Sequence, residues 1–241
     1  MMIVGRRRGG MTARELHAYM TDVHGPMVVD YIERQPGAAP QCYVQNHVFD
    51  CAYRARAERH DPFALNRDFV TQVWFDNPAR AEASLTTQFY LEKLRPDEAR
   101  FVEQASVVQM PVLEHELLAA GSTAYSSKTF VFLKRAPSVP RDGFLAACQR
   151  VTQALRDGST VSASGIGRWL HNECVQRPGR DAPVDAIEEI WLASDAAARG
   201  LGAQLVTLFE TEMADLIEPG STCLLLAHEH VLFAGTPERH R

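Results

Sequence analysis

The sequence has few cysteines, and their spacing does not favour a metal or redox site. The five cysteines are odd in number and scattered along 241 residues, with no CxxC pair. Reduced, mostly buried thiols are therefore expected. No apolar run approaches the ~20 residues that cross a bilayer, and the N-terminus lacks the apolar core of a signal peptide. We therefore expect a cytoplasmic protein with no membrane partner.

Positive charge is also scarce. The formal net charge is -5, whereas a nucleic-acid partner would require a basic face. Arg6-Arg7-Arg8 is the exception, and we interpret it as a solvated strand end. The sequence contains no P-loop, dinucleotide-binding glycine pattern or nucleophile elbow. Its 46% hydrophobic content is ample for the core of one large domain or of two smaller ones.

The first helix is well signalled. Thr12 and Glu15 form a T-x-x-E capping box, and Met11 with Leu16 can form the hydrophobic staple around it. The residues that follow predict further elements in the first half: strands at 41–49 and 69–75, a helix at 77–94 opened by Pro78, and a last strand at 106–118.

The second half repeats this order. It predicts a strand at 127–136, a helix at 140–155, strands at 165–175 and 185–194, a helix at 195–217 and a strand at 221–233. Two residue matches support an internal duplication, because Trp74 pairs with Trp191 and His115 with His228. Each half then has the β-α-β-β-α-β order of a ferredoxin-like module, an α+β fold. We expect the two antiparallel sheets to pack face to face as an intramolecular α/β barrel enclosing a ligand cavity.

The sequence around His24 carries two conflicting signals. Apolar spacing over 16–32 predicts a helix, but Pro26 has no amide hydrogen and collides with the carbonyl of Asp22. One interpretation is an ordinary helix stop after a last-turn histidine. The other is a kinked corner that orients one imidazole nitrogen and leaves the other free. With an ordinary pKa of about 6.5, such an imidazole suits proton transfer at neutral pH.

The stretch RRRGGMTARELHAYMTDVHGPMV resembles the start of EthD-type domains of the dimeric α/β-barrel superfamily. Their first helix typically carries an aromatic residue followed by His-Gly-Pro, here Tyr19 and His24-Gly25-Pro26. YVQNHVF at 43–49 is similar to their second strand. The resemblance implies a tandem EthD-like protein with modules at 1–121 and 122–241. In the second module, Thr152 and Ala147 stand where the motif has His24 and Tyr19, so the motif is lost there.

Alternation along the predicted strands selects further candidates. On the second strand, Tyr43, Gln45 and His47 share one face, interpreted as the cavity face, although a solvated edge fits His47 equally well. The cavity is expected to receive six more side chains, of which Trp74 and Trp191 also fit a core: Gln72, Trp74, Trp169, His171, Glu189 and Trp191. A buried Glu189 would require a partner or a raised pKa.

Two clusters are possible metal ligands, Glu114-His115-Glu116 and His228-Glu229-His230. Only residues two apart share a strand face, so solvated strand ends explain both at least as well, and we predict no metal site. Relatives on this fold include haem proteins, but no residue stands out as an axial ligand.

The predicted function follows from these residues and from the resemblance to EthD-type domains. Relatives on the same fold include cofactor-free cyclases, dehydratases, decarboxylases, isomerases and monooxygenases. We expect a cofactor-independent lyase, dehydratase or isomerase acting on a small aromatic or polyketide-like molecule, with His24, Tyr19 and His47 as catalytic residues. The alternatives are a ligand-binding accessory protein of a degradation pathway and a haem- or metal-binding barrel. The chain would be a pseudo-dimeric monomer or a homodimer.

Overall fold

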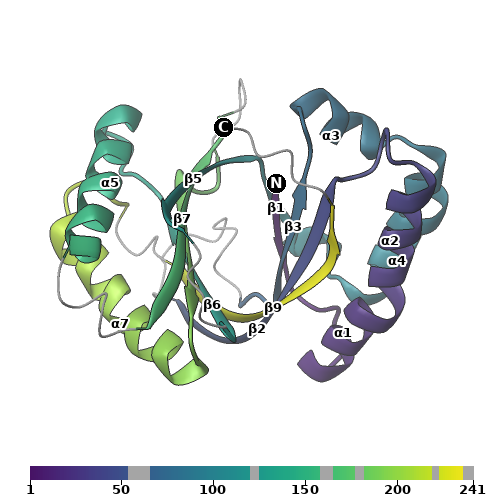
Figure 1. The fold of residues 1–241 in the computed structure, drawn as a ribbon, viewed down its shortest axis with the longest axis horizontal. Coiled ribbons are helices and arrows are strands. Elements are labelled where there is room, and N and C mark those ends of the chain that lie inside the picture. Colours follow the sequence, from purple (N-terminus) through teal and green to yellow (C-terminus); the bar gives the residue numbers. More distant parts are fainter. Residues whose placement is uncertain (54–65, 120–124, 158–164, 177–181, 219–222, 236–241) are drawn as a thin grey trace. The chain divides into compact units, whose positions relative to one another are not determined.

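The computed structural model describes residues 1–53, 66–119, 125–157, 165–176, 182–218 and 223–235 (Figure 1). The chain forms two compact units. The first comprises Met1–His47, Arg67–Gln109 and Glu229–Arg241, and the second comprises Val48–Asn66 and Met110–His228. The predicted boundary at 121–122 lies outside the described residues. Among these residues, no helix is long and apolar enough to span a membrane.

The first unit has a four-stranded sheet in the order β4-β1-β3-β2. Its strands are β1 (Met2–Gly5), β2 (Cys42–Tyr53), β3 (Phe69–Trp74) and β4 (Val108–Met110). β3 lies antiparallel to both β1 and β2, with Gln72 opposite Met2 and Val44. This order is that of a ferredoxin-like module, as predicted.

The helices of the first unit cover one face of its sheet (Figure 1). Their segments in chain order are α1 (Ala13–Tyr19), η1 (Met20–His24), α2 (Gly25–Arg34), α3 (Pro78–Ser84), η2 (Tyr90–Leu94), α4 (Arg95–Phe101) and η3 (Gln104–Ser106). The predicted start of the first helix is confirmed, because Thr12 is its N-cap and forms the capping box with Glu15. The predicted helix at 77–94 is α3 followed by a separate helical segment that runs through Pro96 to Phe101.

The second unit repeats the same strand order, β9-β6-β8-β7, with β5 added beside β7. Its strands are β5 (Val112–Leu118), β6 (Ser127–Leu133), β7 (Ile166–Cys174), β8 (Ala186–Leu192) and the first half of β9 (Cys223–Ala234), whose residues from Glu229 onward belong to the first unit. The helices α5 (Arg141–Asp157) and α7 (Asp195–Glu212) cover one face of this sheet (Figure 1). Two ferredoxin-like α+β modules are therefore confirmed. That the two sheets pack face to face stays a prediction.

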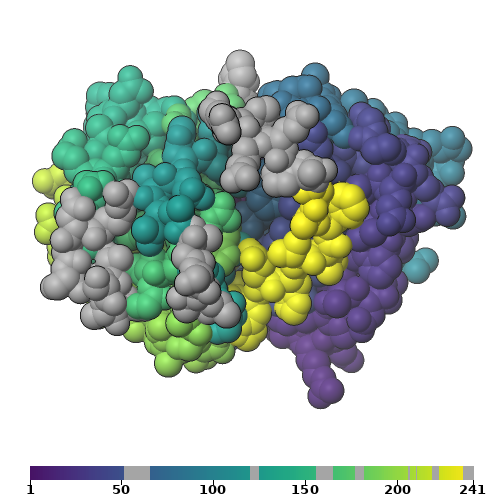
Figure 2. Space-filling view, in the orientation of Figure 1, coloured from purple at the N-terminus to yellow at the C-terminus, as the bar shows by residue number. Residues whose placement is uncertain are grey.

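The predicted last strand of the first half is divided at Pro111. Its first part is β4, while its second part is β5, which pairs antiparallel with β7 in the second unit. Most of β5 is exposed, including Leu113 at 56%. The final part of β9 is exposed as well, with Val231 at 53%, and is visible as the yellow band in Figure 2.

In each unit, apolar side chains fill the space between the helices and the sheet. They show which face of a strand the helices cover. In the first unit, Tyr43 and Val73 pack with Tyr31 and Leu94 of the helices, while Phe69 packs with Leu16. In the second unit, the sheet contributes residues that pack against α5 and α7: Val131, Leu133, Trp169, Ala186, Ile190, Leu192, Leu224 and Leu226. Polar residues on these same faces are therefore covered by helices.

Candidate active site

The helix that carries His24 passes through Gly25-Pro26 without ending. Residues Met20–His24 form a π-helical turn, in which the N–H of Gly25 donates to the carbonyl of Met20 five residues back. Such a wide turn accommodates a proline that would otherwise collide with the preceding turn. The helix-stop interpretation is thus wrong, and the kinked corner takes the form of a π-turn. His24 is its last residue and is 8% exposed.

Gly25 is required where the π-turn meets the rest of the first unit. A Cβ there would lie 2.5 Å from Leu232 Cδ1 and 2.8 Å from the carbonyl oxygen of Met20. The leucine side chain can shift, but the backbone oxygen is fixed by the turn itself. Glycine therefore allows the helix to approach β9 at this point.

A second π-turn precedes Pro96 in the same unit. Residues Tyr90–Leu94 form it, with the N–H of Arg95 donating to the carbonyl of Tyr90. In both helices the proline is the second residue after the π-turn. The residue directly after this proline is Asp97, which is 4% exposed.

Asp97 joins the two helices through hydrogen bonds to the predicted catalytic residues. Its Oδ2 lies 3.0 Å from His24 Nδ1, and the hydroxyl of Tyr19 donates to its Oδ1 at 2.6 Å. The ring of Phe101 packs 4.8 Å from that of His24, between centroids. The structure therefore brings Tyr19 and His24 together, through a carboxylate that the sequence analysis did not identify.

The hydrogen bonds fix the protonation of this group. The bond from His24, with that from Tyr19, lowers the pKa of Asp97 despite its burial, so the carboxylate is ionised at neutral pH. An ionised carboxylate only accepts, so His24 Nδ1 carries a proton. Burial and the adjacent carboxylate raise the pKa of Tyr19. His24 Nε2 forms no hydrogen bond with the described residues, and 11% of the side-chain surface stays exposed.

Polar side chains on the helix-covered face of β2 form hydrogen bonds to the π-turn and to one another. Gln45 Nε2 donates to the carbonyl of Met20 at 2.8 Å and to the hydroxyl of Tyr43 at 2.6 Å, while Gln45 Oε1 lies 3.1 Å from His47 Nε2. Burial raises the pKa of Tyr43. The prediction that Tyr43, Gln45 and His47 face the cavity is therefore wrong, because these residues lie under the helices. A polar side chain is tolerated there because the widened helical turn presents a carbonyl that the buried amide of Gln45 can satisfy.

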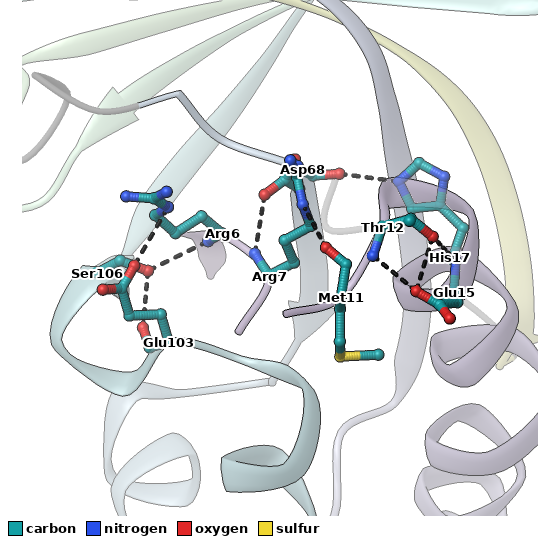
Figure 3. Close-up of polar contacts among 9 residues, drawn as sticks. All are labelled: Arg6, Arg7, Met11, Thr12, Glu15, His17, Asp68, Glu103 and Ser106. Atoms are coloured by element: carbon teal, nitrogen blue, oxygen red, sulfur yellow. Dashed lines mark hydrogen bonds and ion pairs between the residues drawn. The ribbon is translucent and has the colours of Figure 1, made fainter. Parts of the chain in front are cut away.

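His47 lies in the centre of a stack of three imidazoles. Its ring centroid is 4.4 Å from that of His17 and 4.2 Å from that of His230. His17 Nε2 in turn lies 3.1 Å from the carbonyl oxygen of Asp68, whose carboxylate accepts from the backbone of Arg7 at 2.8 Å (Figure 3). These contacts tie the last turn of α1, and Arg7 ahead of that helix, to Asp68 just before β3, and so fix the helix that carries Tyr19 and His24.

The second unit has a different polar group under its helices. Trp169 Nε1 donates to Glu188 Oε2 at 2.8 Å, and His171 Nδ1 lies 2.7 Å from Glu188 Oε1. Burial opposes the charged imidazole, but the carboxylate outweighs it and raises the pKa of His171. Trp169 and His171 were predicted to line the cavity. This prediction is also wrong, because Trp169 is part of the core between the sheet and the helices, and His171 lies on the same face of β7. Among the residues that the structure describes, the buried Nε2 of His171 has no hydrogen-bond partner.

Glu189 and Trp191 lie on the face of β8 that points away from the helices, as predicted. They are the counterparts of Gln72 and Trp74 on β3, for which the same face was predicted. Lys128 Nζ donates to Glu189 Oε1 at 2.8 Å and lies 4.1 Å from the ring centroid of Trp191. Both members of this ion pair are buried. A buried Glu189 does therefore have a partner, and Lys128 is a residue that the sequence analysis missed.

The two units share one side-chain arrangement in detail. Asn46 donates to the carbonyl of Val70 and to Gln72 Oε1, both at 2.9 Å. Asn172 donates to the carbonyl of Ile187 at 3.3 Å and to Glu189 Oε2 at 3.2 Å, at the matching strand positions. This correspondence supports the internal duplication independently of strand order.

The two histidine clusters form no metal site within the described residues, where no three ligating side chains are placed to hold an ion. Glu114, His115 and Glu116 are exposed. His228 instead pairs with Asp195 at 2.9 Å. A hollow of about 440 Å³ does lie beside the candidate site, bordered by Met11, Glu15, Ala18, Tyr19, Asp22, Val23 and Gly10.

A comparison with known protein families gives a match that lies mostly in the first unit. Residues 8–105 match the EthD domain. The match covers less than half of the 241-residue chain, and it identifies an EthD-like region within residues 8–105. Tyr19, His24 and Asp97 all lie inside the matched region, whereas Met110–His228, the larger part of the second unit, lies beyond it. Among curated protein sequences, none matches the chain.

Solved structures extend the fold likeness over both units. An anthrone oxidase-like protein aligns with a TM-score of 0.55 and 9% identity, covering 96% of this chain and 92% of that chain. A protein assigned as a chlorite dismutase gives 0.55 and 10%, covering 96% and 94%. A protein assigned as a monooxygenase from Lactobacillus acidophilus NCFM gives 0.51 and 7%, covering 97% and 95%. Identities this low indicate a shared fold and leave function open.

Proposed function

We propose that this protein is a cofactor-independent enzyme in which His24 transfers protons on a small aromatic or polyketide-like molecule. A lyase, dehydratase or isomerase reaction fits this role. The observation that carries the proposal is the bond from His24 Nδ1 to Asp97, which orients the imidazole and leaves Nε2 for a substrate proton. His47 acts through Gln45 on the π-turn, so we assign it a positioning role.

The open surface hollow beside Tyr19, which His24 does not border, favours an uncharged ligand over an anionic one. Its border is mostly apolar, with Glu15 and Asp22 as charged members and no basic residue. Carboxylates there disfavour an anionic ligand. The residues predicted to bind substrate were Tyr43, Gln72, Trp74, Trp169, His171, Glu189 and Trp191. We retain Gln72, Trp74, Glu189 and Trp191 as candidates, because they lie on the sheet faces that point away from the helices. A monomer or a homodimer fits this proposal.

The test is solvent-deuterium incorporation into a panel of phenols, naphthols and tricyclic aryl ketones, followed by NMR. Proton abstraction by His24 predicts exchange at one carbon with the wild-type protein and a loss of about 10²–10⁴-fold in His24→Gln. His115→Gln, at an exposed imidazole, serves as the matched control and should keep the full rate. Equal rates in wild type and His24→Gln would refute the role of His24. Saturable binding without exchange or product would instead favour the accessory-protein alternative.

Haem or metal binding is a second candidate, favoured by His171. A metal-ligating histidine usually donates its other N–H to a carboxylate. His171 has Glu188 on Nδ1, and its Nε2 has no hydrogen-bond partner in the described part of the chain. An imidazole whose other nitrogen lies on a carboxylate suits a single axial ligand, but His171 is 1% exposed beneath the helices, so haem binding there would require the helices to move. The described residues do not fit a centre with three protein ligands. Titration with haem decides it: a Soret band that His171→Ala abolishes would support this candidate, and a spectrum of free haem would reject it.

A further inference from the structure

The strongest unassigned group is a pair of histidines on neighbouring strands of the second unit. His115 of β5 lies directly opposite His171 of β7 in the antiparallel register. Side chains at opposite positions share one face of a sheet, with Cβ atoms about 4.5–5.5 Å apart. The two imidazole rings lie 6.2 Å apart between centroids, at an interplanar angle of 35°. Two imidazoles therefore approach each other from separate strands.

The hydrogen bond to Glu188 directs the second nitrogen of His171 towards His115. In the sheet order β8-β7-β5, Glu188 of β8 and His115 of β5 lie on opposite sides of β7. His171 Nδ1 lies 2.7 Å from Glu188 Oε1, which turns that side of the ring towards β8. Nε2, across the ring, then points towards β5. Within the described part of the chain, this buried atom has no hydrogen-bond partner.

Glu188 holds His171 in the way that metal-binding proteins orient a ligand. Its Oε2 accepts a hydrogen bond from Trp169 Nε1 at 2.8 Å, so the two oxygens of the carboxylate bind two different side chains. All three side chains are buried. A carboxylate on the second nitrogen fixes the ring orientation of a ligating imidazole and raises its basicity. His171 is therefore oriented before any ion binds.

His115 is the accessible member of the pair. Its side chain is 51% exposed, and its Nε2 lies 3.8 Å from Glu173 Oε2. Exposed side chains change rotamer within nanoseconds, so a single ion can reach Nε2 of His171 from solvent without movement of the helices. Arg141 binds the other carboxylate oxygen of Glu173 at 2.5 Å, which keeps that carboxylate in an ion pair within the protein. The two imidazoles are therefore the ligands that the protein offers.

We propose that His115 and His171 bind a divalent ion of a late transition metal through two imidazole nitrogens, with water completing the coordination. Imidazole suits Zn²⁺, Ni²⁺ and Cu²⁺, whereas Mg²⁺ and Ca²⁺ prefer oxygen ligands. A site with two protein ligands agrees with the lack of any group of three ligating side chains among the described residues. The site belongs to the second unit, and it is independent of the function proposed for His24.

The first experiment is calorimetric titration of the untagged full chain with ZnCl₂. We expect one Zn²⁺ per chain in wild type and loss of this binding in His115→Gln, which removes an exposed ligand and leaves the core intact. His228→Gln is the matched control, because His228 is a partly exposed imidazole paired with Asp195, and it should bind Zn²⁺ as wild type does. Unchanged binding in His115→Gln, or loss of binding in His228→Gln, would overturn the inference.

The ¹⁵N chemical shifts of the imidazoles identify the ligating atoms. Zn²⁺ should shift Nε2 of His171 more than Nδ1, because Nδ1 keeps its bond to Glu188. Glu188→Gln should weaken Zn²⁺ binding about 10–100-fold, whereas Glu116→Gln, at an exposed carboxyl of β5, should have little effect. Binding without a shift at His171, or equal affinities of Glu188→Gln and Glu116→Gln, would contradict the assigned ligands.

Thermal unfolding gives an independent readout. An ion bound between β5 and β7 stabilises the folded chain by mass action, so Zn²⁺ should raise the Tm of wild type and leave that of His115→Gln unchanged. Haem would use the same nitrogen of His171, so Zn²⁺ and haem should exclude each other. Haem binding through His171 that saturating Zn²⁺ does not reduce would reject the two-histidine site.

Discussion

Replacing Asp97 with alanine should destabilise the protein by an amount that its two hydrogen bonds define. The carboxylate accepts from Tyr19 at 2.6 Å and from His24 at 3.0 Å, and hydrogen bonds to a charged group contribute about 1.5–3 kcal/mol each. Tyr19 is partly exposed and regains a water partner, whereas the Nδ1–H of buried His24 does not. We therefore expect a loss of about 2–4 kcal/mol in the free energy of unfolding.

Thermal unfolding followed by circular dichroism measures this loss. For a chain of this size about 2–4 °C corresponds to 1 kcal/mol, so Asp97→Ala should lower Tm by roughly 4–16 °C. Asp30→Ala is the control, because Asp30 forms an exposed i,i+4 ion pair with Arg34 that is worth about 0.3–0.5 kcal/mol. A Tm for Asp97→Ala equal to that of Asp30→Ala would refute the assignment of Asp97 as the link between the two helices.

Three further predictions concern stability. Gly25→Ala should cost about 1–3 kcal/mol, because its Cβ meets the carbonyl of Met20, while Gly37→Ala, with open space around it, should have little effect in chemical denaturation. Lys128→Met should cost about 3–5 kcal/mol, since it removes the cation that balances the buried carboxylate of Glu189, and the added change Glu189→Gln should restore most of that loss in urea titrations. Burial raises the native pKa of Glu98, so its favourable contribution exists below pH 4.5 and is lost as pH rises through the native pKa. Glu98→Gln should accordingly raise Tm at pH 7 and match wild type in scans below about pH 4.

The fold could be predicted largely because its signals are local. The capping box at Thr12 and Glu15 fixes where α1 begins, and the repeated order of periodic segments gives the ferredoxin-like topology of both units. Local sequence signals did not predict that the last strand of the first half is divided at Pro111. Whether a strand segment continues in its own sheet or joins another depends on pairing with β7, which is distant in sequence.

The candidate site was only half predictable for a similar reason. Tyr19 and His24 lie on one helix and share a motif, but Asp97 is 73 residues from His24, and two π-turns are needed to bring them together. Alternation along β2 separates two faces without saying which one the helices cover. The polar side chains suggested a ligand face, whereas Gln45 is polar because it binds the carbonyl of the π-turn.

The central claim is that Asp97 holds the Nδ1–H of His24 and leaves Nε2 free for proton transfer. The ¹⁵N chemical shifts of His24 in the full chain, above the pH at which its imidazole loses a proton, report this tautomer directly. We predict a protonated Nδ1 and an unprotonated Nε2 in wild type, with that preference lost in Asp97→Ala. A proton on Nε2 in wild type, or the same tautomer in both proteins, would contradict the account.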